Sequence, residues 1–363
     1  MKKVFLVLPN LTIGGAEKVY VEIVNNVDLK KFKIYLVIFC NYDNVLKKDI
    51  KSKVETIFLN KKTVKSGIFS FLKVVNKIRP DVLMSSIIHL NILIAILKPF
   101  FPNKTKIICR NSNYYSEIIK LSKYSFLMKI LYKIFIKRFD FHIFISQDQK
   151  KDFLTHFKIP LNKTKVINNP LNFQQIIKKS NALVNLDLFS KSGKTLVVCG
   201  SYKYQKGFDL LIDAINLIRE NNLRVLIIGG GIKSRINQIK KRIKYLDLKK
   251  QIFMIGRKEN VFPYFKNSDA IVIPSRFEGC CNVLIEALCL NKPIICTPAP
   301  GLAKELIKNS TGIFMAKNIS SEALANSIKD FIYSKKKISY SKNIYKADIH
   351  FGIKEYEEIF LKV

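Results

Sequence analysis

The feature that most constrains the fold of this chain is a regular alternation of short apolar runs with longer amphipathic stretches. The run over residues 4–8 stops at Pro9, and the run Ala270–Ile273 stops at Pro274, a residue that cannot donate to a sheet ladder. Short continuous apolar runs are typical of strands buried on both faces of a parallel sheet, and the amphipathic stretches are typical of connecting helices. The alternation therefore predicts a doubly wound α/β fold.

The alternation occurs twice, with a break near the middle of the 363 residues. The first series of predicted strands comprises residues 4–8, 34–39, 56–59, 81–85, 106–109, 141–146 and 165–167. The second series comprises residues 195–199, 224–228, 252–255, 270–273 and 293–296. Periodicity fades between the two series. We therefore predict two Rossmann-like domains that face each other across a cleft, residues 1–170 and 195–345, joined by a linker over residues 171–194.

The charge of the chain is strongly unbalanced, because 63 Lys and Arg residues against 27 Asp and Glu residues give a net charge of +36. Such a charge favours an anionic partner, either a membrane surface or nucleic acid. Lysine is abundant together with isoleucine and asparagine, so part of the charge reflects composition and charge alone identifies no partner. The most apolar long stretch, residues 82–97, contains Ser85, Ser86, His89 and Asn91, so we expect no membrane-spanning helix.

The seven cysteines lie mostly inside apolar segments, and no pair has the spacing of metal ligands. An odd number of buried thiols is typical of a protein kept reduced, so we expect a cytoplasmic location without disulfides.

Two carboxylates follow the predicted strand Ala270–Ile273. Glu278 lies in the loop after the strand, and Glu286 lies in the early turns of a helix whose predicted N-cap is Asn282. Gly279 allows a backbone to approach a ligand closely. Because ligands of open α/β sheets collect at the carboxyl ends of the strands, both carboxylates should border a crevice.

This stretch resembles the E-x7-E motif of retaining glycosyltransferases of family 4, group 1, which have the GT-B fold. The wider family pattern, P-S-x-x-E-G-x-x-N-x-x-x-E-A, is matched by Pro274, Ser275, Glu278, Gly279, Asn282, Glu286 and Ala287. The resemblance implies a bacterial enzyme that moves a hexosyl or N-acetylhexosaminyl group from a nucleotide-sugar, a UDP-sugar, to a lipopolysaccharide, O-antigen or capsule glycan. In the alternative, purely structural interpretation, Glu286 pairs with a core lysine and Glu278 is a solvated loop carboxylate.

A second segment matches the same family at the diphosphate. Departure of the diphosphate builds negative charge, which requires fixed positive groups or a metal ion. The chain has no D-x-D sequence, so we expect neither a metal requirement nor another cofactor. Residues 200–211, GSYKYQKGFDLL, resemble the family loop G-R-L-x-x-x-K-G, with Lys206 at the diphosphate-binding lysine. Ser201 stands where the family usually has arginine, which Lys203 could replace; in the alternative interpretation Lys206 is one more surface lysine.

The amino-terminal segment NLTIGGAE, residues 10–17, places two glycines at a strand-to-helix turn, where unpaired N–H groups favour an anion. It resembles the G-G-A-E loop that closes over the donor diphosphate in family 4; the alternative is a plain tight turn. The full set of donor-binding residues implied by the resemblance is Gly14, Gly15, Ser201, Lys203, Lys206, Gly230, Arg257, Glu278, Gly279, Cys280, Asn282, Val283 and Glu286.

Within this set, the resemblance assigns the ribose hydroxyls to Glu286, the sugar hydroxyls to Glu278, and the nucleotide base to the glycine loop at Gly230 near Arg257. The run of residues 229–231 lacks the third spaced glycine of a dinucleotide fingerprint, so a nicotinamide cofactor is not expected. The catalytic residues implied are Glu278, Lys206, Arg110 and Asn111, the last two at the end of the predicted strand 106–109. Retention implies same-face attack assisted by the leaving phosphate.

Residues 118–139 interleave lysines and one arginine with aliphatic and aromatic residues. We expect a basic amphipathic helix that lies in an anionic membrane interface, which would place the enzyme on the inner face of the cytoplasmic membrane, beside a lipid-linked acceptor. The alternative is an ordinary helix with a solvated lysine face. No nucleic-acid-binding motif is present, so nucleic acid is not an expected partner. The rival function is a basic membrane- or nucleic-acid-binding protein of this fold without turnover.

The carboxyl-terminal tail has Phe351, Tyr356, Ile359 and Phe360 at helical spacing. It resembles the terminal helix of GT-B enzymes that crosses back onto the first domain, over about residues 346–363.

Overall fold

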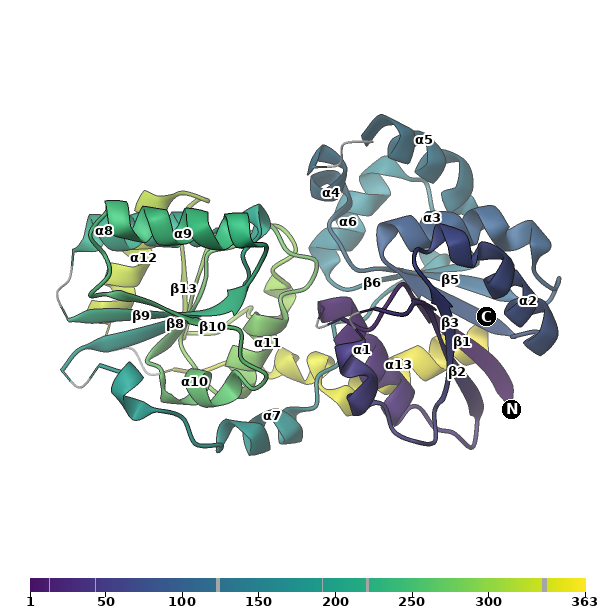
Figure 1. Cartoon of the computed structure of the whole chain (residues 1–363), viewed down its shortest axis with the longest axis horizontal. Helices are drawn as coiled ribbons and strands as arrows, with labels where there is room; N and C mark the ends of the chain where they lie inside the picture. The colour runs from purple at the N-terminus through teal and green to yellow at the C-terminus, as the bar shows by residue number, and fades with distance from the viewer. Residues whose placement is uncertain (13, 43, 122–124, 191, 220–221, 335–337) are drawn as a thin grey trace. The chain divides into compact units, whose positions relative to one another are not determined.

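The computed structural model describes residues 1–12, 14–42, 44–121, 125–190, 192–219, 222–334 and 338–363. It divides into two compact units, one made of Met1–Leu171 with Lys346–Val363 and one made of Asn172–Tyr345. In each unit the described strands pair in parallel, and helices cover both faces of the sheet (Figure 1). The predicted doubly wound α/β class is therefore confirmed.

The first unit is built on a seven-stranded sheet of order β3-β2-β1-β4-β5-β6-β7. Its strands are β1 (Lys2–Leu8), β2 (Phe32–Cys40), β3 (Glu55–Lys61), β4 (Val82–Ser86), β5 (Lys106–Asn111), β6 (Phe141–Phe144) and β7 (Thr164–Val166). Its α-helices are α1 (Gly15–Asn26), α2 (Ile68–Ile78), α3 (Ile88–Leu97), α4 (Tyr115–Leu121), α5 (Ser125–Phe135), α6 (Gln147–His156) and α13 (Ile349–Lys362). The strand order reverses between β1 and β4, the kind of position at which doubly wound sheets bind ligands.

Two separate cores fill the faces of this sheet. Along β1, Val4 and Leu6 pack with α1 and α13, whereas Phe5 and Val7 belong to the core formed with α2, α3, α5 and α6. Successive side chains of a strand point to opposite faces, so a strand covered on both sides must be apolar throughout. This requirement is the physical origin of the continuous apolar runs in the sequence.

The second unit is built on a six-stranded sheet of order β10-β9-β8-β11-β12-β13. Its strands are β8 (Lys194–Ser201), β9 (Leu223–Gly230), β10 (Ile252–Gly256), β11 (Ala270–Ile273), β12 (Ile294–Cys296) and β13 (Ile313–Met315). Its α-helices are α7 (Phe173–Ser180), α8 (Phe208–Ile218), α9 (Lys233–Tyr245), α10 (Phe262–Asn267), α11 (Asn282–Cys289) and α12 (Ser321–Tyr333). Helices α8, α9 and α12 share one core with the sheet, and α7 packs on α10 and α11 (Figure 1).

The last helix of the chain, α13, belongs to the first unit. Tyr356 and Phe360 are fully buried there, and the Lys2 ammonium donates to the main-chain carbonyl of Phe360 at 3.1 Å. A Cβ atom added at Gly352 would lie 2.7 Å from the Pro170 side chain, so the helix packs directly on the end of the first segment.

Two stretches differ from the predicted elements. The segment expected as a linker over residues 171–194 contains α7, because the Asn172 side chain caps the Gln175 N–H and Ile176 is buried. The single helix expected over residues 118–139 is observed as α4, α5 and a 3-10 turn at Ile136–Arg138. Lys123, counted among its lysines, lies outside the described residues. In the described part of the chain, every helix is too short or too polar to cross a bilayer.

Candidate functional site in the second unit

Two loops meet at the carboxyl edge of the second sheet. One follows β8 and carries Lys206, and the other follows β11 and carries Glu278. Because β8 and β11 are hydrogen-bonded parallel neighbours, their loops emerge at the same edge, where α/β sheets bind ligands.

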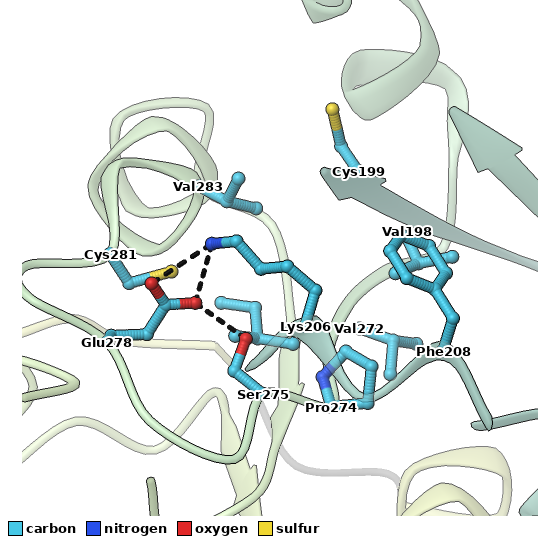
Figure 2. Close-up of a pocket in the computed structure, with 11 residues that line it drawn as sticks. Val198, Cys199, Lys206, Phe208, Val272, Pro274, Ser275, Glu278, Cys281 and Val283 are labelled. Carbon is cyan, nitrogen blue, oxygen red and sulfur yellow. Dashed lines mark hydrogen bonds and ion pairs between the residues drawn. The ribbon is translucent and has the colours of Figure 1, made fainter. Parts of the chain in front are cut away.

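The centre of this site is an ion pair between Lys206 and Glu278. The Lys206 ammonium donates to both carboxylate oxygens of Glu278, at 2.7 and 3.0 Å, and the Ser275 hydroxyl donates to one of them at 2.6 Å (Figure 2). The Lys206 side chain keeps 22% of its surface exposed and that of Glu278 only 5%. Lys206 and Glu278 lie 72 positions apart, in the two segments that resemble the family. The structure brings them into direct contact.

The electrostatics of the pair keep Lys206 ionised. Burial opposes the charged form of Lys206, but the neighbouring Glu278 carboxylate more than compensates and raises the pKa of the lysine above its ordinary value. The adjacent Cys281 thiol is buried, which raises its pKa well above the ordinary value and leaves it protonated. At neutral pH the site thus contains a fixed cation, Lys206, beside a neutral thiol, Cys281.

A cavity of about 10 Å³ adjoins the pair, enough for about one water molecule. Lys206, Glu278, Ser275 and Cys281 line it together with apolar residues such as Val198 and Phe208 (Figure 2). A phosphate group is larger than this cavity, and the Lys206 side chain is partly exposed beside it.

Two glycines are required by the way these loops pack. Gly207 has a φ of +60°, and a Cβ atom there would lie 1.9 Å from the Pro274 carbonyl oxygen. Gly301 has a φ of +76°, and its Cβ atom would lie 2.0 Å from the Glu278 carbonyl oxygen. A side chain at either position would collide with the opposite backbone, so both glycines are needed to hold Lys206 and Glu278 in place.

The residues predicted to hold the nucleotide lie along the same edge. Ser201 and Gly230 are paired at the ends of β8 and β9, and the Arg257 side chain lies 3.9 Å from the Cβ position of Gly230. Lys203 is exposed, and no ion pair of it is found among the described residues. The predicted proximity of Gly230 and Arg257 is therefore observed.

Helix α11 carries the second glutamate of the motif. Glu286 is 8% exposed, Gly279 and Cys280 are buried, and Val283 is half-buried. The N-cap prediction for Asn282 was wrong by one position, because Cys281 has the extended cap conformation and Asn282 is the first helical residue.

In the first unit, the turn at Gly14 and Gly15 was predicted to bind the donor diphosphate, and its surroundings fit that prediction less well. Gly14 is the N-cap of α1 and Gly15 its first residue, but a Cβ atom at Gly14 would lie 2.1 Å from a Glu17 carboxylate oxygen. The helix amino terminus thus already has an anionic side chain beside it, where the G-G-A-E resemblance implied a phosphate.

Arg110 and Asn111 occupy the end of β5 as predicted, but Arg110 is fully buried. Its guanidinium donates to the side-chain oxygens of Tyr356 at 2.9 Å, Ser86 at 3.3 Å and Asn169 at 2.6 Å. Asn111 is 6% exposed and donates to the Ile143 carbonyl. In this conformation Arg110 ties α13 to the sheet and cannot contact a substrate, so the geometry does not support the predicted catalytic role for it.

Two residues that shape the site have no role predicted from the sequence. Ser275 is one position of the family pattern, yet its hydroxyl donates directly to Glu278. Arg276 forms a bidentate ion pair with Asp209, which lies 67 positions earlier. Only the three-dimensional structure shows this partnership, since nothing local in the sequence links the two residues.

Comparison with known proteins agrees with this geometry. Residues 187–347 match the family described as "Glycosyl transferases group 1", and residues 13–175 match "Glycosyltransferase Family 4". The two matches cover one structural unit each. The chain belongs to the family 4-like group 1 glycosyltransferases.

Individual glycosyltransferases resemble this family member over much of its length. An uncharacterized glycosyltransferase of Methanocaldococcus jannaschii is 30% identical over 66% of this chain and 61% of its own length. The N-acetylgalactosamine-N,N'-diacetylbacillosaminyl-diphospho-undecaprenol 4-alpha-N-acetylgalactosaminyltransferase of Campylobacter jejuni is 23% identical over 84% of this chain and 83% of its own length.

The fold comparison covers the entire glycosyltransferase chain. The crystal structure of Anabaena Alr3699/HepE in complex with UDP and glucose matches with a TM-score of 0.81 at 16% identity, covering all of both chains. The predicted GT-B fold is therefore confirmed.

Proposed function

We propose that this glycosyltransferase transfers a sugar from a UDP-sugar to a lipid-linked surface glycan, with retention of the anomeric configuration and without a metal ion. The observation that carries the proposal is the ion pair of the partly exposed Lys206 with the buried Glu278 at the carboxyl edge of the sheet. Two named proteins support the choice of substrates: a structure of the same fold was solved with UDP and glucose, and the Campylobacter relative is named for a diphospho-undecaprenol acceptor.

The proposed mechanism uses the fixed charges of the second unit. The donor diphosphate replaces Glu278 as the partner of the Lys206 ammonium. The ammonium then stabilises the negative charge that develops as the bond from the anomeric carbon to the phosphate oxygen breaks. The acceptor hydroxyl attacks the same face and gives its proton to the departing phosphate oxygen. Glu278, held by Ser275, accepts from sugar hydroxyls, and Glu286 accepts from the ribose. The base lies at Gly230 and Arg257.

A donor screen tests the proposal against its rival. The chain is titrated with a panel of nucleotide-sugars, once with and once without a chelator, and binding and slow hydrolysis are measured. We expect saturable binding of a UDP-sugar. Failure of every donor, together with tight oligonucleotide binding, would favour a basic nucleic-acid-binding protein of this fold. Donor binding that vanishes with the chelator would contradict only the metal-free mechanism.

We further propose that the first unit docks on the anionic inner face of the cytoplasmic membrane through α5, where a lipid-linked acceptor resides. Four apolar side chains of this helix are exposed: Phe126 by 76%, Leu127 by 53%, Ile130 by 38% and Ile134 by 58%. Met128 and Tyr132 face the core instead. An apolar face this large on the surface of a folded protein is typical of an interaction site.

Lysines flank the apolar face of α5. Lys129 and Lys133 lie on the helix and Lys137 in the 3-10 turn after it, and all three are exposed. Aromatic and aliphatic residues beside lysines fit an anionic membrane interface, where each cation contributes about 1 kcal/mol to binding. This arrangement favours a membrane partner over the solvated-face alternative, since a purely solvated face would not present Phe126.

Vesicle flotation tests the docking surface. The triple variant Lys129→Glu, Lys133→Glu, Lys137→Glu should lose binding to anionic vesicles, and the wild-type binding should weaken with salt. The matched control is Lys240→Glu, Lys241→Glu, Lys244→Glu on the exposed helix α9, which changes the net charge equally. Equal losses in the two variants would show that only net charge matters. Unchanged binding in the α5 variant would remove this surface from the proposal.

A further inference from the structure

A second ion pair ties the two loops of the donor site together. The Arg276 guanidinium donates to both carboxylate oxygens of Asp209, at 2.9 and 2.6 Å, and to the main-chain carbonyl of Tyr204 at 2.8 Å. Its central carbon also lies 3.9 Å from the centre of the Tyr204 ring. Arg276 thus contacts the β8 loop and the start of α8 from the loop that follows β11.

These contacts lie on both sides of Lys206. Tyr204 precedes the lysine and Asp209 follows it, while Arg276 itself lies two positions before Glu278. The main chain adds two further ties: the Arg276 N–H donates to the Gln205 carbonyl at 2.7 Å, and the Gln205 amide donates to the Phe277 carbonyl at 3.1 Å. The segment that holds the cation and the segment that holds the carboxylate are therefore joined through Arg276.

The form of these contacts requires arginine. A guanidinium can make two parallel hydrogen bonds to a carboxylate while it stacks on an aromatic ring, whereas an ammonium can do neither in the same way. The Arg276 side chain is 16% exposed and that of Asp209 is 48% exposed, so the pair lies at the surface with the guanidinium as its less exposed partner.

We propose that Arg276 is a positioning residue that holds the loop of Lys206 and the loop of Glu278 in the arrangement that receives a nucleotide diphosphate. The inference rests on the proposed function, because it assumes that this pair is the diphosphate site. Without the clamp, the β8 loop with its exposed Lys203 and Tyr204 would have to be ordered when the nucleotide binds, and that ordering would reduce affinity.

The chain offers a matched control for a merely structural role. Arg242 of α9 forms a similar bidentate pair, at 2.6 and 2.5 Å, with Asp213. Asp213 lies in α8, the helix that also carries Asp209. Among the described residues, the side-chain hydrogen bonds of Arg242 go to Asp213 and to neither loop of the donor site. Loss of either arginine removes one Arg–Asp pair from α8, but only loss of Arg276 should alter nucleotide binding.

The test is calorimetric titration of UDP into the wild type, Arg276→Ala, Arg276→Lys and Arg242→Ala, well below the unfolding temperature of each. We expect about tenfold weaker UDP binding for Arg276→Ala, a loss only partly restored by lysine, and a change within about twofold for Arg242→Ala. Thermal unfolding of the two alanine variants measures the structural contribution separately. If Arg276→Ala does not fold, Asp209→Asn, which removes the charge at constant size, should show the same loss.

The outcomes separate the inference from the function on which it rests. If Arg276→Ala binds UDP as tightly as the wild type, or loses no more affinity than Arg242→Ala, then Arg276 only stabilises α8, and the inference alone is overturned. Failure of the wild type to bind UDP would overturn the proposed nucleotide, and the positioning role would fall with it.

Discussion

Each unit of this glycosyltransferase holds a cation at the carboxyl edge of its sheet, but the two cations have different surroundings. Lys206 is partly exposed, borders a small cavity and is paired with the Glu278 carboxylate. Arg110 is fully enclosed and donates to neutral oxygens of Tyr356, Ser86 and Asn169. No carboxylate lies within ion-pair distance of Arg110 among the residues that the structure describes.

The difference shows what a cation at a strand end can do. Lys206 can turn toward a phosphate without movement of a helix, because part of its side chain is exposed. Arg110 cannot reach a ligand unless α13 moves, because Tyr356 of that helix accepts one of its hydrogen bonds. A partner of opposite charge and partial exposure therefore favour a ligand-binding role for Lys206, and enclosure by neutral groups favours a structural role for Arg110.

The largest effect should come from Lys206→Ala. Loss of the fixed charge at the leaving diphosphate should slow donor turnover by about 100- to 1000-fold, the range seen when one stabilising donor is removed. Donor hydrolysis, measured beside the exposed-lysine control Lys240→Ala, gives the rate. Turnover at the wild-type rate in a folded Lys206→Ala variant would mean that the donor site lies elsewhere.

Arg110→Met should show the opposite pattern, with UDP affinity retained and stability reduced. Removing the guanidinium leaves three buried oxygen-bearing groups without their donor, so we expect the free energy of unfolding to fall by about 2 to 5 kcal/mol. Denaturant unfolding and UDP titration on the same variant measure the two quantities. A stable Arg110→Met variant with impaired turnover would reverse the comparison and restore the predicted catalytic role.

Glu286→Ala sharpens the comparison within the second unit. If this part of α11 holds the ribose, the variant should bind UDP more weakly by about 1 to 3 kcal/mol, since the ribose hydroxyls would lose their acceptor. Binding of a free diphosphate should not change. Calorimetry with UDP and with pyrophosphate distinguishes the two contributions, and parallel losses for both ligands would place Glu286 at the phosphates.

His142 is a buried group of the first unit that can lose its charge by deprotonation. Burial lowers its pKa from the ordinary value to about 3, and neither ring nitrogen has a hydrogen-bond partner among the described residues. Between pH 3 and 6.5 the unfolded chain therefore binds the extra proton, so stability is lost as pH falls, by at most about 1.4 kcal/mol per pH unit from this group.

His142→Phe is the corresponding variant. It fills a space already lined by Phe139, Phe144 and Phe153 and removes the titratable group. Its free energy of unfolding should depend less steeply on pH, between about 3 and 6.5, than that of the wild type. Identical slopes would indicate that His142 is solvated in the folded protein.

The fold could be predicted from the sequence because the pattern that determines it is local. Strands such as β1 and β11 are continuous apolar runs. Such runs are typical of strands that are buried on both faces of a parallel sheet. Helix α7 was missed because it has only 8 residues, of which Ile176 and Ser180 alone are buried, so its apolar face is too short to stand out from a linker.

The site could be predicted only in part. Glu278 and Lys206 stand in recognisable segments, but their direct contact, and the Arg276 clamp that joins the segments, arise from residues far apart in the chain. For Arg110 the position at a strand end was predicted correctly, but its burial was not. That burial depends on α13, whose Tyr356 lies 246 positions later in the chain. A sequence pattern identifies which residues reach an edge of the sheet, but not which of them remain accessible.

The most direct test of the account is a crystal structure of the wild-type enzyme with UDP, grown in the presence of a chelator. We predict the terminal phosphate of UDP within about 3 Å of the Lys206 ammonium, as expected for a charge-assisted hydrogen bond, with Arg110 still enclosed beneath α13. A nucleotide bound away from Lys206, or a phosphate in contact with Arg110, would contradict the assignment of the two cations.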